Sequence, residues 1–200
     1  MINQPSISTE STQASNRAPR QPRDAWFNAG LRLLVDTGAD ALTVDRLCAA
    51  VERSKGSFYH HFSDVNGYTA ALLDYWQELH TESVMRTVDQ LPTLSGKRQA
   101  LANMALSLDS ATERAVRQWA ARNPIVQHRL RKIDEQRVAY LTDLIAKLNG
   151  DGDLANALEL ARIEYAAFVG MLHVFPDICQ EDLKRMLQRI IGLVTPDAPE

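Results

Sequence analysis

Residues 41–64 read ALTVDRLCAAVERSKGSFYHHFSD and carry the most specific structural pattern in the chain. It holds two short segments with the apolar spacing of helices, Val44 to Val51 and about Lys55 to Phe62, joined by a few polar residues. Thr43 is a candidate N-cap for the first segment, because its hydroxyl can accept a hydrogen bond from an otherwise unpaired amide. Two short helices joined by a tight turn and packed on a third form a helix-turn-helix unit, which the pattern predicts.

The two predicted helices have an inward apolar face and an outward polar face. Leu47, Cys48 and Val51 form the inward face of the first helix, and Phe58 and Phe62, four residues apart, hold the second helix against it. An outward face selected only for solubility more often carries Glu and Lys at four-residue spacing. The outward side chains here instead suit contacts with phosphates and base edges; they are Lys55, Ser57, Tyr59, His60 and His61.

Further helices extend in both directions, separated almost throughout by proline or glycine. Long segments without proline permit long helices, because proline lacks a backbone donor and clashes with the preceding turn. No strand alternation is convincing, so the sequence predicts an all-α fold of about nine helices. The fourth helix carries Tyr68, Leu72, Trp76 and Leu79 at helical spacing. The expected ranges are about 23–37, 44–51, 55–62, 65 to before Pro92, 96–110, 112–123, 124–149, 153–173 and 180–194.

Composition limits the functional class. Apolar residues make up 45% and charged residues 24% of the 200 residues, and the net charge is −3, values of an ordinary globular protein. No apolar run approaches the roughly 18–20 residues of a membrane span, and the start lacks the pattern of a signal peptide. We therefore expect a cytoplasmic protein with no membrane partner. Cys48 and Cys179 are too few and too distant for a disulfide framework or a zinc site, and no metal or cofactor is expected.

Residues 26–40, WFNAGLRLLVDTGAD, and residues 41–64 together strongly resemble the DNA-binding domain of TetR-type transcriptional regulators. The resemblance covers roughly residues 23–73 and is most specific in SKGSFYHHF, residues 54–62. It implies a three-helix DNA-binding domain, 19–66, and a helical ligand-binding and dimerisation domain, 67–195. Residues 1–18, rich in Ser, Thr, Gln and Asn, are expected to form a disordered tail, and residues 196–200 a second tail.

The resemblance also assigns roles to individual residues. It places Thr43 against the DNA backbone and the start of the second short helix in the major groove, with Tyr59 and His61 on phosphates and His60 exposed beside them. Two departures stand out: Glu52 occupies a turn position that is usually glycine, and no basic residue follows Phe62. Because a non-glycine residue in the left-handed conformation costs roughly 1–2 kcal/mol, we expect a slightly different turn. Either Arg53 or the tail residues Arg17 and Arg20 can replace the missing phosphate contact. The expected DNA-binding residues are Thr43, Arg53, Ser54, Lys55, Gly56, Ser57, Tyr59, His60 and His61.

The C-terminal part contains candidates for a ligand cavity. Arg137 interrupts the apolar stripe of residues 124–149, and a guanidinium there is costly unless paired. It can extend to the surface, pair with an acidic residue such as Glu164, or bind an anionic ligand. Ligand pockets combine aromatic walls with a few polar groups, although aromatic residues at helical spacing also form ordinary core. The candidates for a cavity beside the fourth helix are Trp119, His128, Arg137, Tyr140, Tyr165 and His173.

The last two predicted helices have apolar faces too wide for one neighbour, and the resemblance implies a homodimer through a four-helix interface. Two-fold symmetry lets a dimer read a palindrome with half-sites about 34–36 Å apart. We therefore expect a repressor that binds double-stranded DNA at a palindromic operator and is released by an unidentified small-molecule effector. Two alternatives stay open: a TetR-like protein-interaction module that no longer binds DNA, and a helical-bundle enzyme. The chain lacks the Glu-x-x-His pairs of di-metal bundles and shows no nucleophile–base spacing, which argues against the enzyme.

Overall fold

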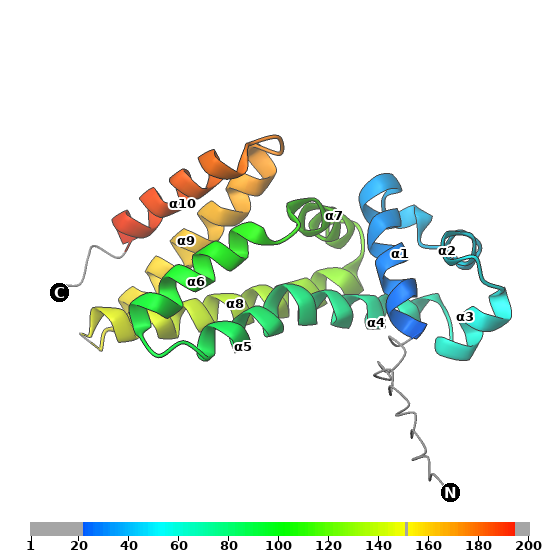
Figure 1. Cartoon of the computed structure of the whole chain (residues 1–200), viewed down its shortest axis with the longest axis horizontal. Coiled ribbons are helices and arrows are strands. Elements are labelled where there is room, and N and C mark those ends of the chain that lie inside the picture. The colour runs from blue at the N-terminus through cyan, green and yellow to red at the C-terminus, as the bar shows by residue number, and fades with distance from the viewer. Residues whose placement is uncertain (1–21, 151, 195–200) are drawn as a thin grey trace, which may run out of the picture.

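The computed structural model describes residues 22–150 and 152–194, and this part of the chain is helical throughout, without strands. The predicted all-α fold is confirmed, while the tails expected at residues 1–18 and 196–200 lie outside the described residues. Figure 1 shows a small head formed by α1, α2 and α3 beside a larger body, with α4 running from one into the other. The elements are α1 Pro22–Thr37, the 3₁₀ turn η1 Ala39–Ala41, α2 Val44–Val51, α3 Lys55–His61, α4 Val65–Gln77, the π segment η2 Glu78–Glu82, α5 Ser83–Asp89, α6 Leu94–Ser107, α7 Ser110–Ala120, α8 Pro124–Asn149, α9 Leu154–Val174 and α10 Gln180–Val194.

The segments α4, η2 and α5 form one continuous helix, because the residues at both junctions keep right-handed helical angles. Counted this way, the described residues contain the nine helices that the sequence predicts. The sequence did not predict the π segment, and the expected apolar stripe on this helix is wrong after Trp76. A π turn uses i→i+5 hydrogen bonds and takes up an extra residue, so the inward position after Trp76 moves from Leu79 to Thr81. Leu79 is 41% exposed, whereas Thr81 is 2% exposed.

Helix caps fix the other boundaries. The expected starts of α6 and α7 are wrong by two residues, because Thr93 and Asp109 cap these helices earlier: the Thr93 hydroxyl accepts from the Gly96 amide at 3.1 Å, and Asp109 Oδ1 from the Ala111 amide at 3.0 Å. The bounds predicted for α8 are confirmed. Asn123 caps its N-terminus, and Gly150 ends it in the left-handed conformation, where glycine carries no steric penalty.

The core of the head is aromatic. Trp26 packs edge-on against Phe58 at 5.6 Å between ring centroids, and Phe62 packs edge-on against Tyr68 at 5.0 Å. All four rings are buried. The single hydroxyl among them is satisfied, since Tyr68 donates to the Trp26 carbonyl at 2.9 Å. Gly30 lets α1 and α4 approach closely, because a Cβ at this position would lie 1.8 Å from the Tyr68 hydroxyl oxygen.

The same apolar cluster continues from the head into the body. It includes Ala115, Val116 and Trp119 of α7 and the first turns of α8 around Val126 and Leu130. Figure 1 shows α7 standing between the head and the rest of the body. The head therefore rests on α7 as well as on α4, so that a movement of either helix reaches it.

The rest of the body is formed by α6, α8, α9 and α10, which enclose two smaller apolar clusters. Several large apolar side chains on α9 and α10 stay exposed, among them Ile163, Val174 and Leu193, at 50%, 67% and 81%. Across residues 22–150 and 152–194, no helix has both the length and the apolar character needed to span a membrane.

Candidate functional site

The two short helices of the head begin at side-chain caps that keep their hydroxyl protons available. Thr43 Oγ1 accepts from the Arg46 amide at 3.4 Å, and Ser54 Oγ accepts from the Ser57 amide at 3.2 Å. Both capping residues are exposed. Because a hydroxyl can accept one hydrogen bond and still donate another, each cap can also donate to an anion such as a phosphate.

The outward side of α3 is polar and open. Tyr59 is 55% exposed and His60 is exposed, whereas His61 is half-buried with its ring 6.4 Å from that of Trp26. Burial lowers the pKa of His61, and the neighbouring His60 and Arg23 lower it further. Lys55 pairs with Asp45 of α2 at 2.6 Å, which raises the pKa of Lys55. Lys55 is therefore a cation held in place on the face.

The turn between α2 and α3 departs from ideal geometry at the position that the sequence singled out. Glu52 has φ 54° and ψ 47°, the left-handed conformation, and it is the one non-glycine residue with positive φ among the residues described. Gly56 needs no such conformation and has room for a side chain, since only Ser54 Oγ, at 3.6 Å, would meet its Cβ. Packing within this protein therefore does not explain a glycine at position 56.

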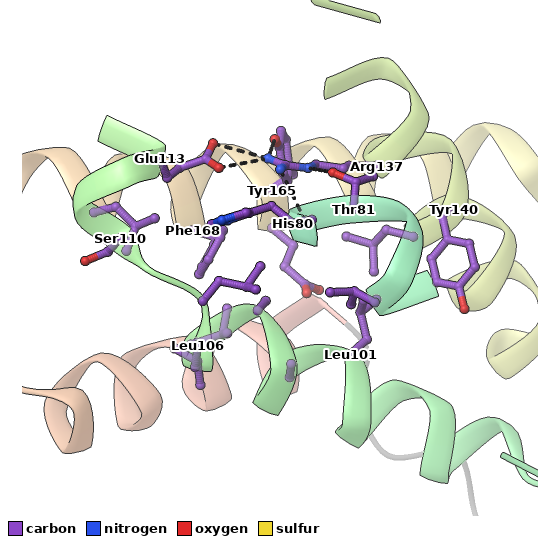
Figure 2. A pocket seen from close by; sticks show the side chains of 18 of the residues that line it. His80, Thr81, Leu101, Leu106, Ser110, Glu113, Arg137, Tyr140, Tyr165 and Phe168 are labelled. Atoms are coloured by element: carbon purple, nitrogen blue, oxygen red, sulfur yellow. Dashed lines mark hydrogen bonds and ion pairs between the residues drawn. The ribbon is translucent and has the colours of Figure 1, made fainter. Parts of the chain in front are cut away.

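A second feature is a cavity of about 110 Å³ inside the body. The π segment and α5 to α10 all contribute to its wall (Figure 2). Most of the lining is apolar, with Leu101, Leu106 and Phe168 among the contributors, but one side carries His80, Thr81, Glu113, Arg137 and Tyr165. Such a mixture is typical of small-molecule sites.

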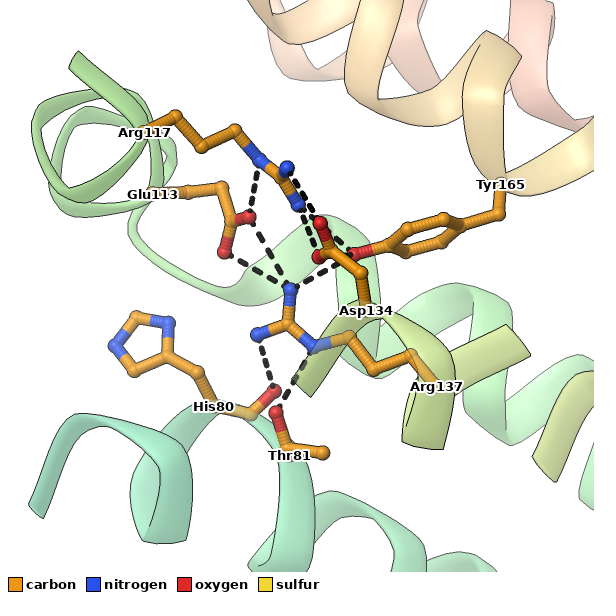
Figure 3. Close-up of polar contacts among 7 residues, drawn as sticks. All are labelled: His80, Thr81, Glu113, Arg117, Asp134, Arg137 and Tyr165. Carbon is orange, nitrogen blue, oxygen red and sulfur yellow. Dashed lines mark hydrogen bonds and ion pairs between the residues drawn. The ribbon is translucent and has the colours of Figure 1, made fainter. Parts of the chain in front are cut away.

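The polar side of this cavity belongs to a network of buried charges that joins η2, α7, α8 and α9 (Figure 3). Arg137 Nη1 donates to both Glu113 oxygens at 3.2 Å, and its Nε donates to Thr81 Oγ1 at 2.9 Å. Arg117 donates to Glu113 at 2.8 Å and to Asp134 at 2.7 Å. The two guanidinium groups thus share the Glu113 carboxylate.

Tyr165 completes the network: its hydroxyl donates to Asp134 Oδ1 at 2.6 Å and accepts from Arg137 at 3.2 Å. Burial raises the pKa of Tyr165 to about 12, although the two guanidinium groups oppose this. Burial alone would lower the pKa of Arg137, but Glu113 and Tyr165 more than offset it and raise the pKa. At neutral pH Tyr165 therefore keeps its proton, and Arg137 keeps its charge within the network.

Comparison with known proteins identifies the head. Residues 27–64 match the family model described as bacterial regulatory proteins, tetR family. Those residues run from the second turn of α1 to the cap of α4, and they contain the whole outward face of α3. The chain is a TetR-family transcriptional regulator. No curated protein matches it in sequence.

Solved structures of TetR-family proteins share the fold of the body as well as the fold of the head. SCO4454, a TetR-family regulator from Streptomyces coelicolor, is 19% identical, with a TM-score of 0.71 over 94% of this chain and 95% of that one. AibR in complex with isovaleryl coenzyme A and operator DNA is 16% identical, with a TM-score of 0.65 over 88% of this chain and 98% of that one. A chain from Rhodococcus sp. described as a TetR-family regulator is 18% identical, with a TM-score of 0.70 over 86% of this chain and 98% of that one.

In the head of this regulator, the structure brings the predicted DNA-binding residues to the surface together. Seven are exposed, and Ser57 and His61 are half-buried. That these residues contact DNA stays a prediction. The full set is Thr43, Arg53, Ser54, Lys55, Gly56, Ser57, Tyr59, His60 and His61.

In the body, the structure separates the predicted ligand-binding residues into two groups. Arg137, Tyr140 and Tyr165 line the cavity. The other three do not: His128 and His173 are exposed, and Trp119 lies in the core that joins α7 to the head. Helical spacing alone shows which residues share a face of one helix, but it does not show which neighbouring helix that face meets.

The partner suggested for Arg137 also needs correction. Glu164 does not reach Arg137, because it pairs with Arg98 of α6. The carboxylate that pairs with Arg137 is Glu113 of α7. Glu113 was not among the predicted cavity residues, although its four-residue spacing from Arg117 suggests a pair. His80 was not among them either, because the unpredicted π segment turns it toward the cavity. Among the described residues, no three His, Cys, Asp or Glu side chains gather as a metal site would require.

Proposed function

We propose that this regulator is a homodimeric repressor that leaves a palindromic operator when a small molecule occupies the body cavity. One observation carries this proposal: a single helix, residues 65–89, packs Tyr68 into the core of the head and places His80 and Thr81 in the cavity wall. A ligand that displaces the second half of this helix therefore acts on the element that positions the head. The ligand must favour the released conformation, because equal affinity for both conformations shifts neither.

The proposed DNA interface is the exposed face of α3 with the caps of α2 and α3. Gly56 supports it, because the fold leaves space beside this glycine and a DNA backbone in close approach would use that space. Thr43 and Ser54 offer hydroxyl donors, Arg53 and Lys55 offer charge, and Tyr59 offers a phenol. Such groups fix a helix on phosphates and read base edges.

The proposed dimer interface lies on α9 and α10. Ile163 and Val174 are exposed on α9, with the small residues Ala167 and Gly170 between them at helical spacing, and Leu193 is exposed on α10. A contiguous apolar surface of this kind marks an interaction site, and small residues allow close approach of a second helix. We retain 19–66 as the DNA-binding domain and 67–195 as the ligand-binding and dimerisation domain, in a protein that acts in the cytoplasm on chromosomal DNA.

The test of this proposal is footprinting of the full chain on the DNA that flanks its gene, at several salt concentrations. We expect a protected palindrome and binding that weakens steeply as salt rises. Lys55→Ala should weaken binding and lower the salt slope by about one unit, and Tyr59→Phe should weaken binding without unfolding the protein. Lys147→Ala is the matched control, because Lys147 is an exposed lysine on α8, far in sequence from α3, paired with Asp143.

Two results would contradict the proposal. If the folded protein protects no fragment at low salt, the chain is a TetR-like interaction module and not a DNA-binding repressor. If Lys55→Ala and Tyr59→Phe bind like the wild type, the interface lies elsewhere on the head. The dimer is tested separately: Leu193→Glu should produce monomers in analytical ultracentrifugation and lose operator binding, whereas Glu181→Gln at the other end of α10 should change neither.

A further inference from the structure

The charges that line the body cavity are already paired with one another. Arg137 pairs with Glu113, and Arg98 pairs with Glu164. The remaining charged group, Asp109, accepts hydrogen bonds from the Ala111 amide and the Thr112 hydroxyl at the start of α7. No cation that lines the cavity is therefore left for an anionic ligand, and to release one from a buried pair would leave its carboxylate buried without a partner, which is strongly unfavourable.

Two residues that line the cavity, His80 and Arg98, each carry a buried polar atom with no hydrogen-bond partner. His80 Nδ1 and Arg98 Nε are buried and make no hydrogen bond, and Arg98 as a whole is 7% exposed. Arg98 Nε can only donate, and His80 Nδ1 donates in one of its two tautomers. A buried donor without an acceptor destabilises the folded protein, because the donor has lost its hydrogen bond to water. A ligand oxygen that accepts hydrogen bonds from these atoms would recover that free energy.

The remaining wall sets the size and character of the ligand. It is formed by aliphatic and aromatic side chains such as Val84, Ala102, Leu106 and Leu172. The cavity volume is about 110 Å³. An engineered apolar cavity of about 150 Å³ in another protein holds one benzene molecule. A single small ring or a short branched chain therefore matches this cavity, and a nucleotide-sized group does not.

We propose that the effector is an uncharged, compact and mostly apolar molecule with one or two hydrogen-bond-accepting oxygens, such as a ketone, an ester or an alcohol, held by His80 and Arg98. This inference rests on the proposed function only in taking the body cavity as the effector site. It differs from the anionic ligand that Arg137 suggested from the sequence, because Glu113 already neutralises that guanidinium.

The position of His80 gives such a ligand a route to the head. His80 lies in the π segment, which separates the part of the long helix packed against the head from the part packed in the body. Figure 2 shows its imidazole directed into the cavity toward Phe168. Segments of π helix are local irregularities that occur frequently at functional sites. A hydrogen bond at His80 therefore acts on the helix at this irregularity.

The experiment compares four five-carbon ring compounds that differ in their polar group. The dissociation constants of cyclopentanone, cyclopentane, cyclopentanecarboxylate and cyclopentylammonium are measured by ligand-observed NMR on the full chain. Cyclopentanone should bind at least tenfold more tightly than the carboxylate or the ammonium ion, and more tightly than cyclopentane. Isovaleryl coenzyme A should not bind, because its phosphates find no free cation in the cavity wall. Tighter binding of the carboxylate or of isovaleryl coenzyme A would overturn the inference.

Variants locate the binding. His80→Phe keeps a ring but removes Nδ1, and we expect it to weaken cyclopentanone binding about tenfold; His128→Phe, the same change at an exposed histidine of α8, should leave binding unchanged. Ala102→Leu fills the cavity and should abolish binding. The double change Arg98→Met with Glu164→Leu removes the donor without leaving a buried charge, and it should also weaken binding. Equal binding by wild type, His80→Phe and Ala102→Leu, with native circular dichroism, would overturn the site.

The outcomes for ligand class and for regulation are separable. If cyclopentanone binds as expected but does not release operator DNA, the ligand class stands and the coupling in the proposed function fails. If the protein does not bind DNA at all, the four dissociation constants still decide the ligand class. If none of the four compounds binds the folded protein at millimolar concentration, the inference is wrong even where DNA binding is confirmed.

Discussion

The head and the body of this protein are filled in opposite ways. The head buries five aromatic rings, and its one buried hydroxyl donates to a backbone carbonyl. The body buries two arginines and a glutamate in a shared network, with a cavity beside them. Interlocking rings have few alternative arrangements at native packing density. The cavity beside the charge network, in contrast, leaves space that a ligand can enter. We therefore expect the head to keep one conformation and the body to change conformation when a ligand binds.

The largest effect should come from breaking the charge network. Glu113→Leu leaves Arg137 without its carboxylate and Arg117 with only Asp134, and should lower the free energy of unfolding by about 3–5 kcal/mol. Urea denaturation monitored by circular dichroism measures this. Asp143→Leu, which removes the partner of an exposed lysine, should cost less than about 1 kcal/mol. Equal losses in both variants would mean that the body network contributes no more to the free energy of unfolding than a surface ion pair does.

The aromatic head is tested next, at its closest helix contact. Gly30→Ala forces a Cβ onto the Tyr68 hydroxyl, and overpacking of this kind costs about 1–3 kcal/mol. Thermal unfolding should show a clear fall in the midpoint. Gly192→Ala on α10 meets no atom within 4 Å and should stabilise the helix by about 0.5–1 kcal/mol. If Gly30→Ala unfolds with the wild-type midpoint, the packing between α1 and α4 tolerates an added Cβ, and the head does not have a single fixed conformation.

A smaller change tests the one strained turn of the head. Glu52→Gly should raise the free energy of unfolding by about 1 kcal/mol, because glycine adopts the left-handed conformation without the steric cost of a Cβ. Chemical denaturation of the wild type, Glu52→Gly and Glu52→Ala measures it. Glu52→Ala keeps the Cβ and should gain nothing, so a gain in both variants would assign the effect to the carboxylate and not to backbone strain.

The smallest expected effect is a pH dependence located in the body. Burial lowers the pKa of His80, with Arg137 lowering it further while Glu113 and Asp109 raise it. The folded protein therefore favours the neutral ring. The stability from this preference is complete above the unfolded pKa of about 6.5 and is lost as the pH falls below it. His80→Phe should lose less stability than the wild type between pH 7.5 and pH 5.5, and His128→Phe should lose as much as the wild type.

Local signals explain why so much of the architecture could be predicted. Asn123, Pro124 and Gly150 determine both ends of α8 through their own backbone and capping preferences, without reference to the rest of the molecule. The caps Thr43 and Ser54 likewise define the two short helices of the head. The conformation of Glu52 was not predicted: the sequence led us to expect a slightly different turn, whereas Glu52 adopts the left-handed angles that glycine favours.

The cavity could not be predicted in the same way. His128 and His173 have the residue type and spacing of ligand contacts but lie on the outside, whereas Arg98 and His80 line the wall. Which face of a helix meets which neighbour depends on the packing of six helices at once. The π segment adds a further shift, since it moves the inward position from Leu79 to Thr81.

The helices, their order and the DNA-binding head could be predicted from the sequence, because caps, prolines and apolar spacing act over a few residues. The partners of the buried charges could not, since Glu113 lies 24 positions before Arg137 and Glu164 lies 66 positions after Arg98. Electrostatic pairing depends on distance in space. The polarity of the cavity, and with it the uncharged ligand that we propose, follows from how the folded helices bring those charges together.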